Sequence, residues 1–147
     1  RQIVNEFACG FSAISENEHF ARIIAAGFIA QASPTVTQLA DVKCAVSEAV
    51  TNCIVHAYPD GGLKNQVKMS LRLYDDNFVA ITISDKGIGI PDVAAAREPL
   101  YMTDTTGERS GMGFAIMESL MDSIRVTSKV GRGTTVTLKL KLGLPDE

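Results

Sequence analysis

The sequence predicts an α+β domain, a two-layer sandwich in which helices cover one face of a mixed, mostly antiparallel sheet. The predicted elements follow the order strand, helix, helix, strand, strand, loop, helix, strand, strand. Short turns join two of the strand pairs, as in antiparallel hairpins, and the pattern lacks the repeated strand–helix–strand units of a parallel sheet. A length of 147 residues suits one core of ordinary size. We therefore expect residues 1–147 to form a single domain.

The first part of the chain predicts an edge strand and two helices. Residues 6–13 place two phenylalanines among small residues, which indicates a short edge strand. Residues 15–18 (Ser-Glu-Asn-Glu) form a capping-box pattern, and apolar residues at helical spacing follow it: Phe20, Ile23, Ile24, Gly27 and Phe28. After Pro34 a second helix extends roughly to Tyr58, and one of its faces is apolar: Leu39, Val42, Val46, Ala49, Val50, Cys53 and Ala57.

A hairpin follows the helices. Residues 59–62 (Pro-Asp-Gly-Gly) end the second helix. Residues 67–73 alternate apolar and polar side chains, as a half-buried strand does. After a turn at residues 75–77, residues 78–84 are apolar enough to form a central strand of the sheet.

The last part of the chain predicts a long loop, a helix and a second hairpin. Residues 91–110 lose periodicity and are rich in Thr, Asp and Gly; a loop of this length inside a compact domain usually has a function. Helical spacing returns over residues 111–121. Residues 124–130 and 134–142 then form two strands around a Gly-Arg-Gly turn.

Composition and charge narrow the classes of protein. Hydrophobic residues make up 46% of the chain and charged residues 21%, which favours a folded domain over a disordered one. No apolar run reaches the ~18 residues that cross a bilayer, so we expect a cytoplasmic protein without membrane contact. The net charge of −3 and the lack of a Lys/Arg cluster argue against direct nucleic-acid binding. Three cysteines without metal-binding spacing predict reduced core thiols: Cys9, Cys44 and Cys53.

The second helix carries the first candidate site. Between Cys44 and Tyr58 the only formally charged side chain is that of Glu48. A carboxylate in so apolar a segment is unfavourable unless it is paired, binds a metal or has a function. Glu48, Asn52 and His56 are spaced at i, i+4 and i+8, so they share one helix face, roughly opposite the apolar stripe. The alternative is that Glu48 is simply exposed and Asn52 solvated.

Two glycine-containing segments are further candidates. Asp85-Lys86-Gly87-Ile88-Gly89 ends an apolar strand, where an Asp can accept a hydrogen bond in a pocket and glycines let the backbone approach a flat ligand. Residues 109–113 (Arg-Ser-Gly-Met-Gly) precede a helix whose N-terminal amides suit a phosphate. An ordinary turn and a flexible helix start are the respective alternatives. The chain contains no Walker-type loop, no dinucleotide-binding fingerprint and no G-x-S-x-G motif.

Four motifs in this order resemble the N, G1, G2 and terminal boxes of the ATPase superfamily shared by gyrase, Hsp90, histidine kinases and MutL: Glu48-x-x-x-Asn52, Asp85-x-Gly87-x-Gly89, Ser110-Gly111-Met112-Gly113 and Gly133-Thr134-Thr135. The resemblance covers nearly the whole chain and implies the Bergerat ATP-binding fold. Within the superfamily, residues 17–22, 47–52 and 108–114 resemble the sporulation anti-sigma factors, serine kinases that also hold a sigma factor.

The resemblance implies ATP and Mg²⁺ as cofactors and gives each motif a role. Asp85 would bind the exocyclic amine of adenine, with Thr134 nearby. Gly87 and Gly89 would shape the base pocket, and Asn52 would ligate Mg²⁺.

The resemblance also implies a phosphate site, a base and a partner contact. Residues 91–110 would form an ATP lid, and the residues beneath it would hold the phosphates: Arg109, Ser110, Gly111 and Gly113. Glu48 would act as general base toward a partner's serine, and Arg22 would contact the sigma factor and the anti-anti-sigma protein. Two positions depart from the family, because Asp104 stands where the lid commonly has Lys, and Lys86 where an acidic residue is common.

The sequence therefore predicts an anti-sigma factor and ATP-dependent protein serine kinase that inhibits a sigma factor and phosphorylates an anti-anti-sigma protein on serine. A homodimer is expected, since the open sheet face and residues 7–11 permit one. Two alternatives stay open: an ATP-controlled sigma-binding module without kinase activity, and a detached histidine-kinase catalytic domain. Against the second, His19 and His56 lack the acidic neighbour usual at a phosphoacceptor, since Phe20 and Ala57 follow them.

Overall fold

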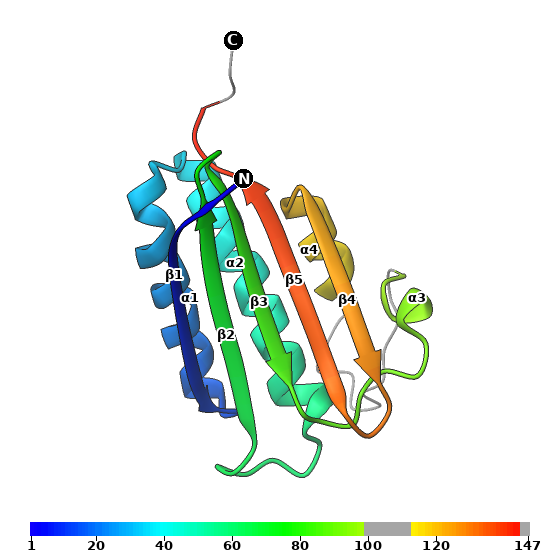
Figure 1. Ribbon diagram of the computed structural model, residues 1–147. Coiled ribbons are helices and arrows are strands. Elements are labelled where there is room, and N and C mark those ends of the chain that lie inside the picture. The colour runs from blue at the N-terminus through cyan, green and yellow to red at the C-terminus, as the bar shows by residue number, and fades with distance from the viewer. Residues whose placement is uncertain (99–112, 145–147) are drawn as a thin grey trace.

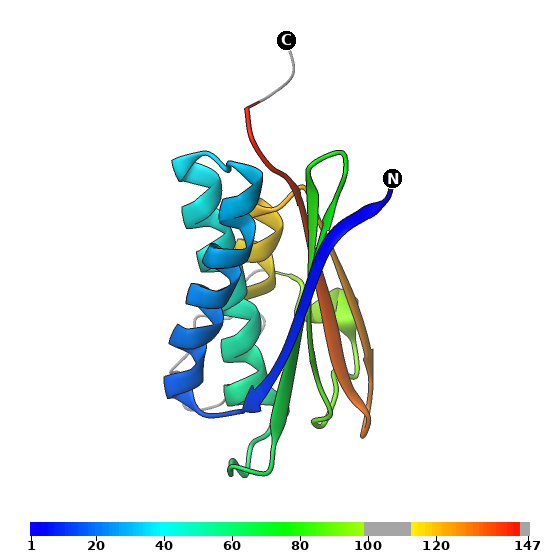
Figure 2. The ribbon, with the colours of Figure 1, turned by 60° about the vertical axis from the view of Figure 1, so that its left-hand side comes forward.

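The computed structural model describes residues 1–98 and 113–144, which form a two-layer sandwich (Figure 1). Its elements are β1 (Ile3–Ser12), α1 (Ser15–Ile29), η1 (Ala30–Ala32), α2 (Val36–Asn52), η2 (Cys53–Ala57), β2 (Gln66–Tyr74), β3 (Phe78–Asp85), α3 (Val93–Ala96), α4 (Gly113–Leu120), β4 (Ser123–Lys129) and β5 (Gly133–Lys141). The five strands form one sheet in the order β1-β2-β3-β5-β4, and every pairing among the described strands is antiparallel. Helices α1, α2 and α4 lie on the same face of the sheet (Figure 2). The predicted fold class is confirmed.

Strand β2 shows how the sequence sets the two faces of the sheet. Its apolar residues Val67, Met69 and Leu71 are fully buried under the helices, while Lys68 and Arg72 between them are exposed. Because side chains alternate along a strand, this pattern fixes which face receives the helices. Strand β1 pairs with β2 along its whole length at the edge of the sheet and is longer than the predicted edge strand.

Helix α1 corrects two details of the sequence prediction. The expected capping box does not form, because Ser15 is already the first helical residue and the N-cap, Ile14, makes no side-chain cap hydrogen bond. The expected apolar stripe is also only partly buried: Phe20 and Ile23 are 60% and 51% exposed. The residues that α1 buries are instead Ala21, Ala25 and Ile29. Small side chains suit this face because they let α1 approach α2 closely.

Helix α2 carries the capping box that the sequence analysis placed on α1. The Thr35 hydroxyl accepts the backbone N–H of Gln38 at 3.1 Å, and the Gln38 side chain accepts the backbone N–H of Thr35 at 2.9 Å. The helical segment runs to Ala57 as predicted, but its last turn, η2, is a π-helix. Contacts with α1, α4 and β3 cover α2 on several sides, which explains why the segment carries so little charge.

A further prediction concerns the loop that follows β3. The predicted loop over residues 91–110 contains the one-turn helix α3, whose first turn is capped by Asp92 accepting the backbone N–H of Ala95 at 3.0 Å. Residues 99–110, with Asp104, lie outside the described residues.

Of the three thiols predicted for the core, Cys53 is buried and Cys9 half-buried, but Cys44 is exposed. In the described ranges, no helix combines the length and apolarity needed to span a membrane.

Candidate functional site

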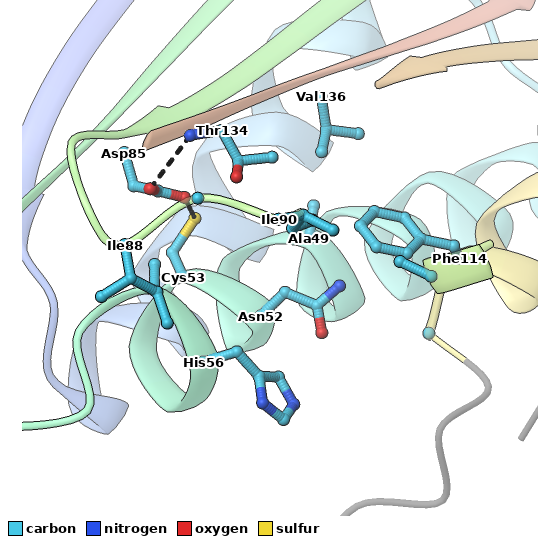
Figure 3. Close-up of a pocket in the computed structure, with 14 residues that line it drawn as sticks. Ala49, Asn52, Cys53, His56, Asp85, Ile88, Ile90, Phe114, Thr134 and Val136 are labelled. Carbon is cyan, nitrogen blue, oxygen red and sulfur yellow. Dashed lines mark hydrogen bonds between the residues drawn. The ribbon is translucent and has the colours of Figure 1, made fainter. Parts of the chain in front are cut away.

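A pocket lies between the α2–η2 segment and the adjoining ends of β3 and β5 (Figure 3). Segments that are distant in the sequence line it: Ala49, Asn52, Cys53, His56 and Ala57; Asp85, Ile88, Gly89 and Ile90; Ala96; Gly113 and Phe114; Thr134 and Val136. Most of these side chains are apolar, and a few polar groups converge among them. This combination is typical of a small-molecule binding site.

Asp85 is the polar anchor of the pocket. It is the last residue of β3 and only 9% exposed. Its Oδ1 accepts the backbone N–H of Gly87 at 2.9 Å. Figure 3 shows the other two bonds: Oδ1 accepts the backbone N–H of Thr134 at 3.2 Å, and Oδ2 accepts the Cys53 thiol, with Sγ at 3.3 Å. Hydrogen bonds of this kind satisfy the acceptor sites of a buried carboxyl group. Asp85 thus lies in the pocket wall, at the end of an apolar strand.

The thiol beside this carboxylate is held in its neutral form. Burial raises the pKa of Cys53 well above its ordinary value, and the neighbouring charge and hydrogen bond of Asp85 raise it further. The sulfur therefore keeps its proton at neutral pH and can donate it in a hydrogen bond.

Two glycines after β3 are needed because backbone segments pack against them. A Cβ on Gly87 would lie 2.2 Å from the carbonyl oxygen of Ala57. A Cβ on Gly89 would lie 2.3 Å from the carbonyl oxygen of Lys129, and Gly89 also has a φ of 77°, which disfavours residues with side chains. The loop after β3 is thus pressed between η2 and the end of β4.

The face of α2 predicted from spacing borders the same pocket. Asn52 and His56 line it, and Glu48 lies one turn earlier on the helix. A Cβ on Gly113 would lie 3.3 Å from the side-chain Oδ1 and Nδ2 of Asn52 and 3.3 Å from Oε2 of Glu48. The start of α4 is therefore in close contact with both polar residues. Arg109, Ser110 and Gly111 lie outside the described residues.

Sequence reasoning missed two residues that support the site. Cys53 was assigned to the core alone, although it follows Asn52 directly and touches Asp85. Tyr58 was taken only as the end of a helix, yet its hydroxyl accepts the backbone N–H of Lys86 and donates to the carbonyl of Gln66, both at 2.7 Å. The sequence signal for both was their position within six residues of Asn52.

Arg22 lies on α1 and does not line the pocket. Its Nε is 2.9 Å from Oε1 of Glu18, an ion pair whose N–H is not aligned as a hydrogen bond. Oε1 of Glu18 also accepts the hydroxyl of Ser47, the residue before Glu48. Arg22 is thus linked to α2 through one carboxylate, on the helix that covers α2.

Comparisons with known proteins agree with this geometry. The family model for the histidine kinase-like ATPase domain matches residues 11–140. The chain belongs to this ATPase family. Members of it named anti-sigma F factor are close in sequence: that of Pasteuria penetrans is 49% identical over 138 residues, covering 94% of this chain and 91% of the relative. That of Bacillus licheniformis is 50% identical over 134 residues, covering 91% and 90%. The family resemblance seen in the four motifs is confirmed.

Solved structures of the family share the fold. The RsbU and RsbW domains of a Mycobacterium tuberculosis protein match with a TM-score of 0.71 at 21% identity, covering 97% of this chain and 34% of that longer one. The catalytic domain of histidine kinase ThkA matches with a TM-score of 0.58 at 14% identity, covering 97% of both chains. Full-length ShkA, with a TM-score of 0.57 at 17% identity over 90% of this chain and 30% of its own, was solved in complex with AMPPNP. These likenesses identify the family's fold.

Proposed function

We propose that the chain is an anti-sigma factor and an ATP-dependent protein serine kinase whose nucleotide state selects between two partners. It binds and inhibits a sigma factor, and it phosphorylates an anti-anti-sigma protein on serine. The main support is that segments carrying the four family motifs meet around one pocket, with Asn52, Asp85, Gly113 and Thr134 in its wall. Curated relatives about half identical over most of the chain are named anti-sigma F factor.

In this proposal adenine binds against Asp85. Oδ1 already accepts two backbone amides and Oδ2 one thiol, which leaves Oδ2 able to accept the exocyclic amine. The apolar side chains of Ile88 and Ile90 and the small Ala49 supply surface for the flat base. Thr134 borders the same carboxylate and assists in recognition of the base.

The phosphates extend toward the start of α4. We assign them to the G2 segment, which comprises Arg109, Ser110, Gly111 and Gly113, beneath a lid formed by residues 91–110 of this single domain. Gly113 supports this direction, because it brings the start of α4 close to the side chain of Asn52, where a Cβ would lie 3.3 Å from Oδ1. Free amides at a helix N-terminus are suited to a phosphate.

The residues at this end fit Mg²⁺. Mg²⁺ prefers oxygen ligands, takes one or two of them from the protein and completes its shell with phosphates and water. The side-chain oxygen of Asn52 would supply the protein ligand. When bound, Mg²⁺ would neutralise charge on the phosphates during transfer.

Glu48 acts as the general base. Its carboxylate lies beside Asn52 and Gly113, where the phosphate end of the nucleotide is placed. It accepts the proton of the partner's serine hydroxyl, the serine oxygen bonds to the γ-phosphorus, and the bond to the ADP oxygen breaks. ATP thus becomes ADP and the serine becomes phosphoserine.

We propose that the partners bind the outer helix and the sheet edge. Arg22 on α1 is proposed to contact the sigma factor and the anti-anti-sigma protein.

A homodimer is supported by apolar residues exposed on β1, an edge strand: Ile3, Val4 and Phe7. The activity belongs in the cytoplasm, where ATP and sigma factors are present. His56 contributes to the pocket wall, which does not suit the phosphoacceptor of a detached histidine-kinase domain.

The proposal is tested with γ-labelled ATP, Mg²⁺ and an anti-anti-sigma protein of a spore-forming relative. We expect label on one serine of the partner and none when that serine is replaced by alanine. Glu48→Gln should bind ATP with unchanged affinity in calorimetry and transfer no label. ATP binding and sigma-factor capture without transfer would instead establish a binding module. Failure of the protein to bind ATP at all would refute the nucleotide site.

A further inference from the structure

The Cys53 thiol belongs to the pocket although no catalytic or binding role has been given to it. Cys53 is the first residue of the π-helix η2 and directly follows Asn52. It is 4% exposed, lines the pocket, and places Sγ 3.3 Å from Oδ2 of Asp85 (Figure 3). π-helical turns often occur at functional sites, where they shift a side chain out of the regular helical position.

The hydrogen bonds of Asp85 show what the thiol adds. Gly87 and Thr134 both donate to Oδ1, so these two backbone amides hold one oxygen of the carboxylate. The only described donor to Oδ2 is the thiol of Cys53. Rotation about the Cβ–Cγ bond of Asp85 moves both oxygens together, and the two amides restrain this rotation through Oδ1 alone. The thiol restrains the same rotation from the opposite oxygen and leaves Oδ2 one acceptor site.

We propose that Cys53 is a positioning residue for base recognition: its S–H fixes Oδ2 of Asp85 so that the remaining acceptor site receives the exocyclic amine of adenine. This inference rests on the proposed adenine site. An alanine at this position lacks a donor, whereas a serine offers a hydroxyl to the same oxygen. The role therefore depends on a donor at residue 53 and is separate from filling space in the core.

The experiment compares two nucleotides by calorimetry with Mg²⁺ present. One is ATP, and the other is purine riboside triphosphate, which lacks the 6-amino group. We expect Cys53→Ala to weaken ATP binding about tenfold, or about 1.4 kcal/mol, and to leave binding of the second nucleotide within about twofold. Cys53→Ser should recover most of the ATP affinity. Cys44→Ala is the matched control, because Cys44 is an exposed thiol on the same helical segment, and it should change neither affinity.

If Cys53→Ala lowers the affinity for both nucleotides equally, the thiol only fills space. If it lowers neither affinity, Asp85 needs no positioning. Each result overturns the inference. The failure of the proposed function looks different, since wild-type protein would then not prefer ATP over purine riboside triphosphate. A measurement on protein with Cys53 intact keeps the inference testable if the variants at residue 53 do not fold. In the infrared spectrum of wild-type protein, the S–H band of Cys53 should lie below that of the exposed Cys44 thiol, which the Cys44→Ala spectrum identifies, and should shift when ATP binds. An unshifted band that does not respond to ATP contradicts the inference.

Discussion

Replacing Gly87 with alanine tests how the pocket is built. The new Cβ would lie 2.2 Å from the carbonyl oxygen of Ala57 and 2.6 Å from its Cβ, whereas ordinary contacts begin at 3.4 Å. That carbonyl also accepts the backbone N–H of Ile88 at 2.9 Å. Because a backbone oxygen cannot rotate away, the loop after β3 must move by more than about 1 Å from η2. The same movement disturbs the hydrogen bond from Gly87 to Asp85.

The size of the effect follows from these contacts. Overpacking of a well-packed region costs about 1–3 kcal/mol, and a buried hydrogen bond left unmade costs about 1–3 kcal/mol. We expect Gly87→Ala to lower the free energy of unfolding by about 3 kcal/mol, which lowers Tm by roughly 6–12 °C in a chain of this size. ATP affinity should fall by about tenfold to a hundredfold, because Asp85 loses an amide donor. Circular dichroism and calorimetry measure the two quantities.

Gly27→Ala is the matched control for this substitution. Gly27 lies in the interior of α1, and a Cβ there would meet nothing within 4 Å. Alanine has a higher helix propensity, so this variant should gain up to about 1 kcal/mol of stability and bind ATP normally. A Gly87→Ala protein with wild-type Tm and wild-type ATP affinity would refute the reasoning, since the loop would then have room that the structure denies it.

Three further substitutions test separate parts of the proposal. Asp85→Asn should weaken ATP binding by about a hundredfold or more in calorimetry, because the charged acceptor is lost; near-normal affinity would remove Asp85 from the base site. Arg22→Ala should weaken sigma-factor binding in a pull-down while ATP affinity stays unchanged, and loss of ATP affinity would contradict its placement away from the pocket. The folded protein holds the Cys53 proton more tightly than the unfolded chain, whose thiol has the ordinary pKa of 9.0. Without nucleotide, the free energy of unfolding should therefore fall above about pH 9, and it should fall more steeply in wild type than in Cys53→Ser, by up to about 1.4 kcal/mol per pH unit. Urea unfolding at several pH values measures this dependence. Equal dependence on pH in the two proteins would count against a raised pKa of Cys53.

The sheet could be predicted because its signal is local. Residues 67–73 alternate apolar and polar side chains, and the following turn leaves an antiparallel return as the simplest arrangement. The buried face of α1 was harder to predict, because the helix has more apolar residues than it buries. Alanines at positions 21 and 25 occupy the inner face, while the large side chains of Phe20 and Ile23 are exposed. The size of an apolar side chain therefore did not decide its burial on this helix, since two small alanines are buried and two larger residues are exposed.

The candidate site also has residues that the sequence alone could predict and residues that it could not. Asp85, Gly87 and Gly89 were found because their pattern is contiguous at the end of an apolar strand. The contact of Gly113 with Asn52 and Glu48 joins residues more than sixty positions apart, and only the family resemblance indicated it beforehand. The contribution of Cys53 was missed because a cysteine beside apolar residues fits a core thiol equally well. Its partner, Asp85, is 32 positions away in the sequence.

The segment after Asn52 explains how the proposed base and phosphate ends of the pocket are held together. Cys53 donates to Asp85, the carbonyl of Ala57 accepts the N–H of Ile88, and the hydroxyl of Tyr58 accepts the N–H of Lys86. Six consecutive residues thus contact the end of β3 and the loop after it at three points, and Asn52, at the proposed phosphate end, directly precedes them. A shift of this segment must therefore move the base anchor and the proposed Mg²⁺ ligand together. In the proposed kinase the partner's serine has to meet the γ-phosphate in line, so one segment that contacts both proposed ends of ATP is a means of orienting the nucleotide before the partner arrives.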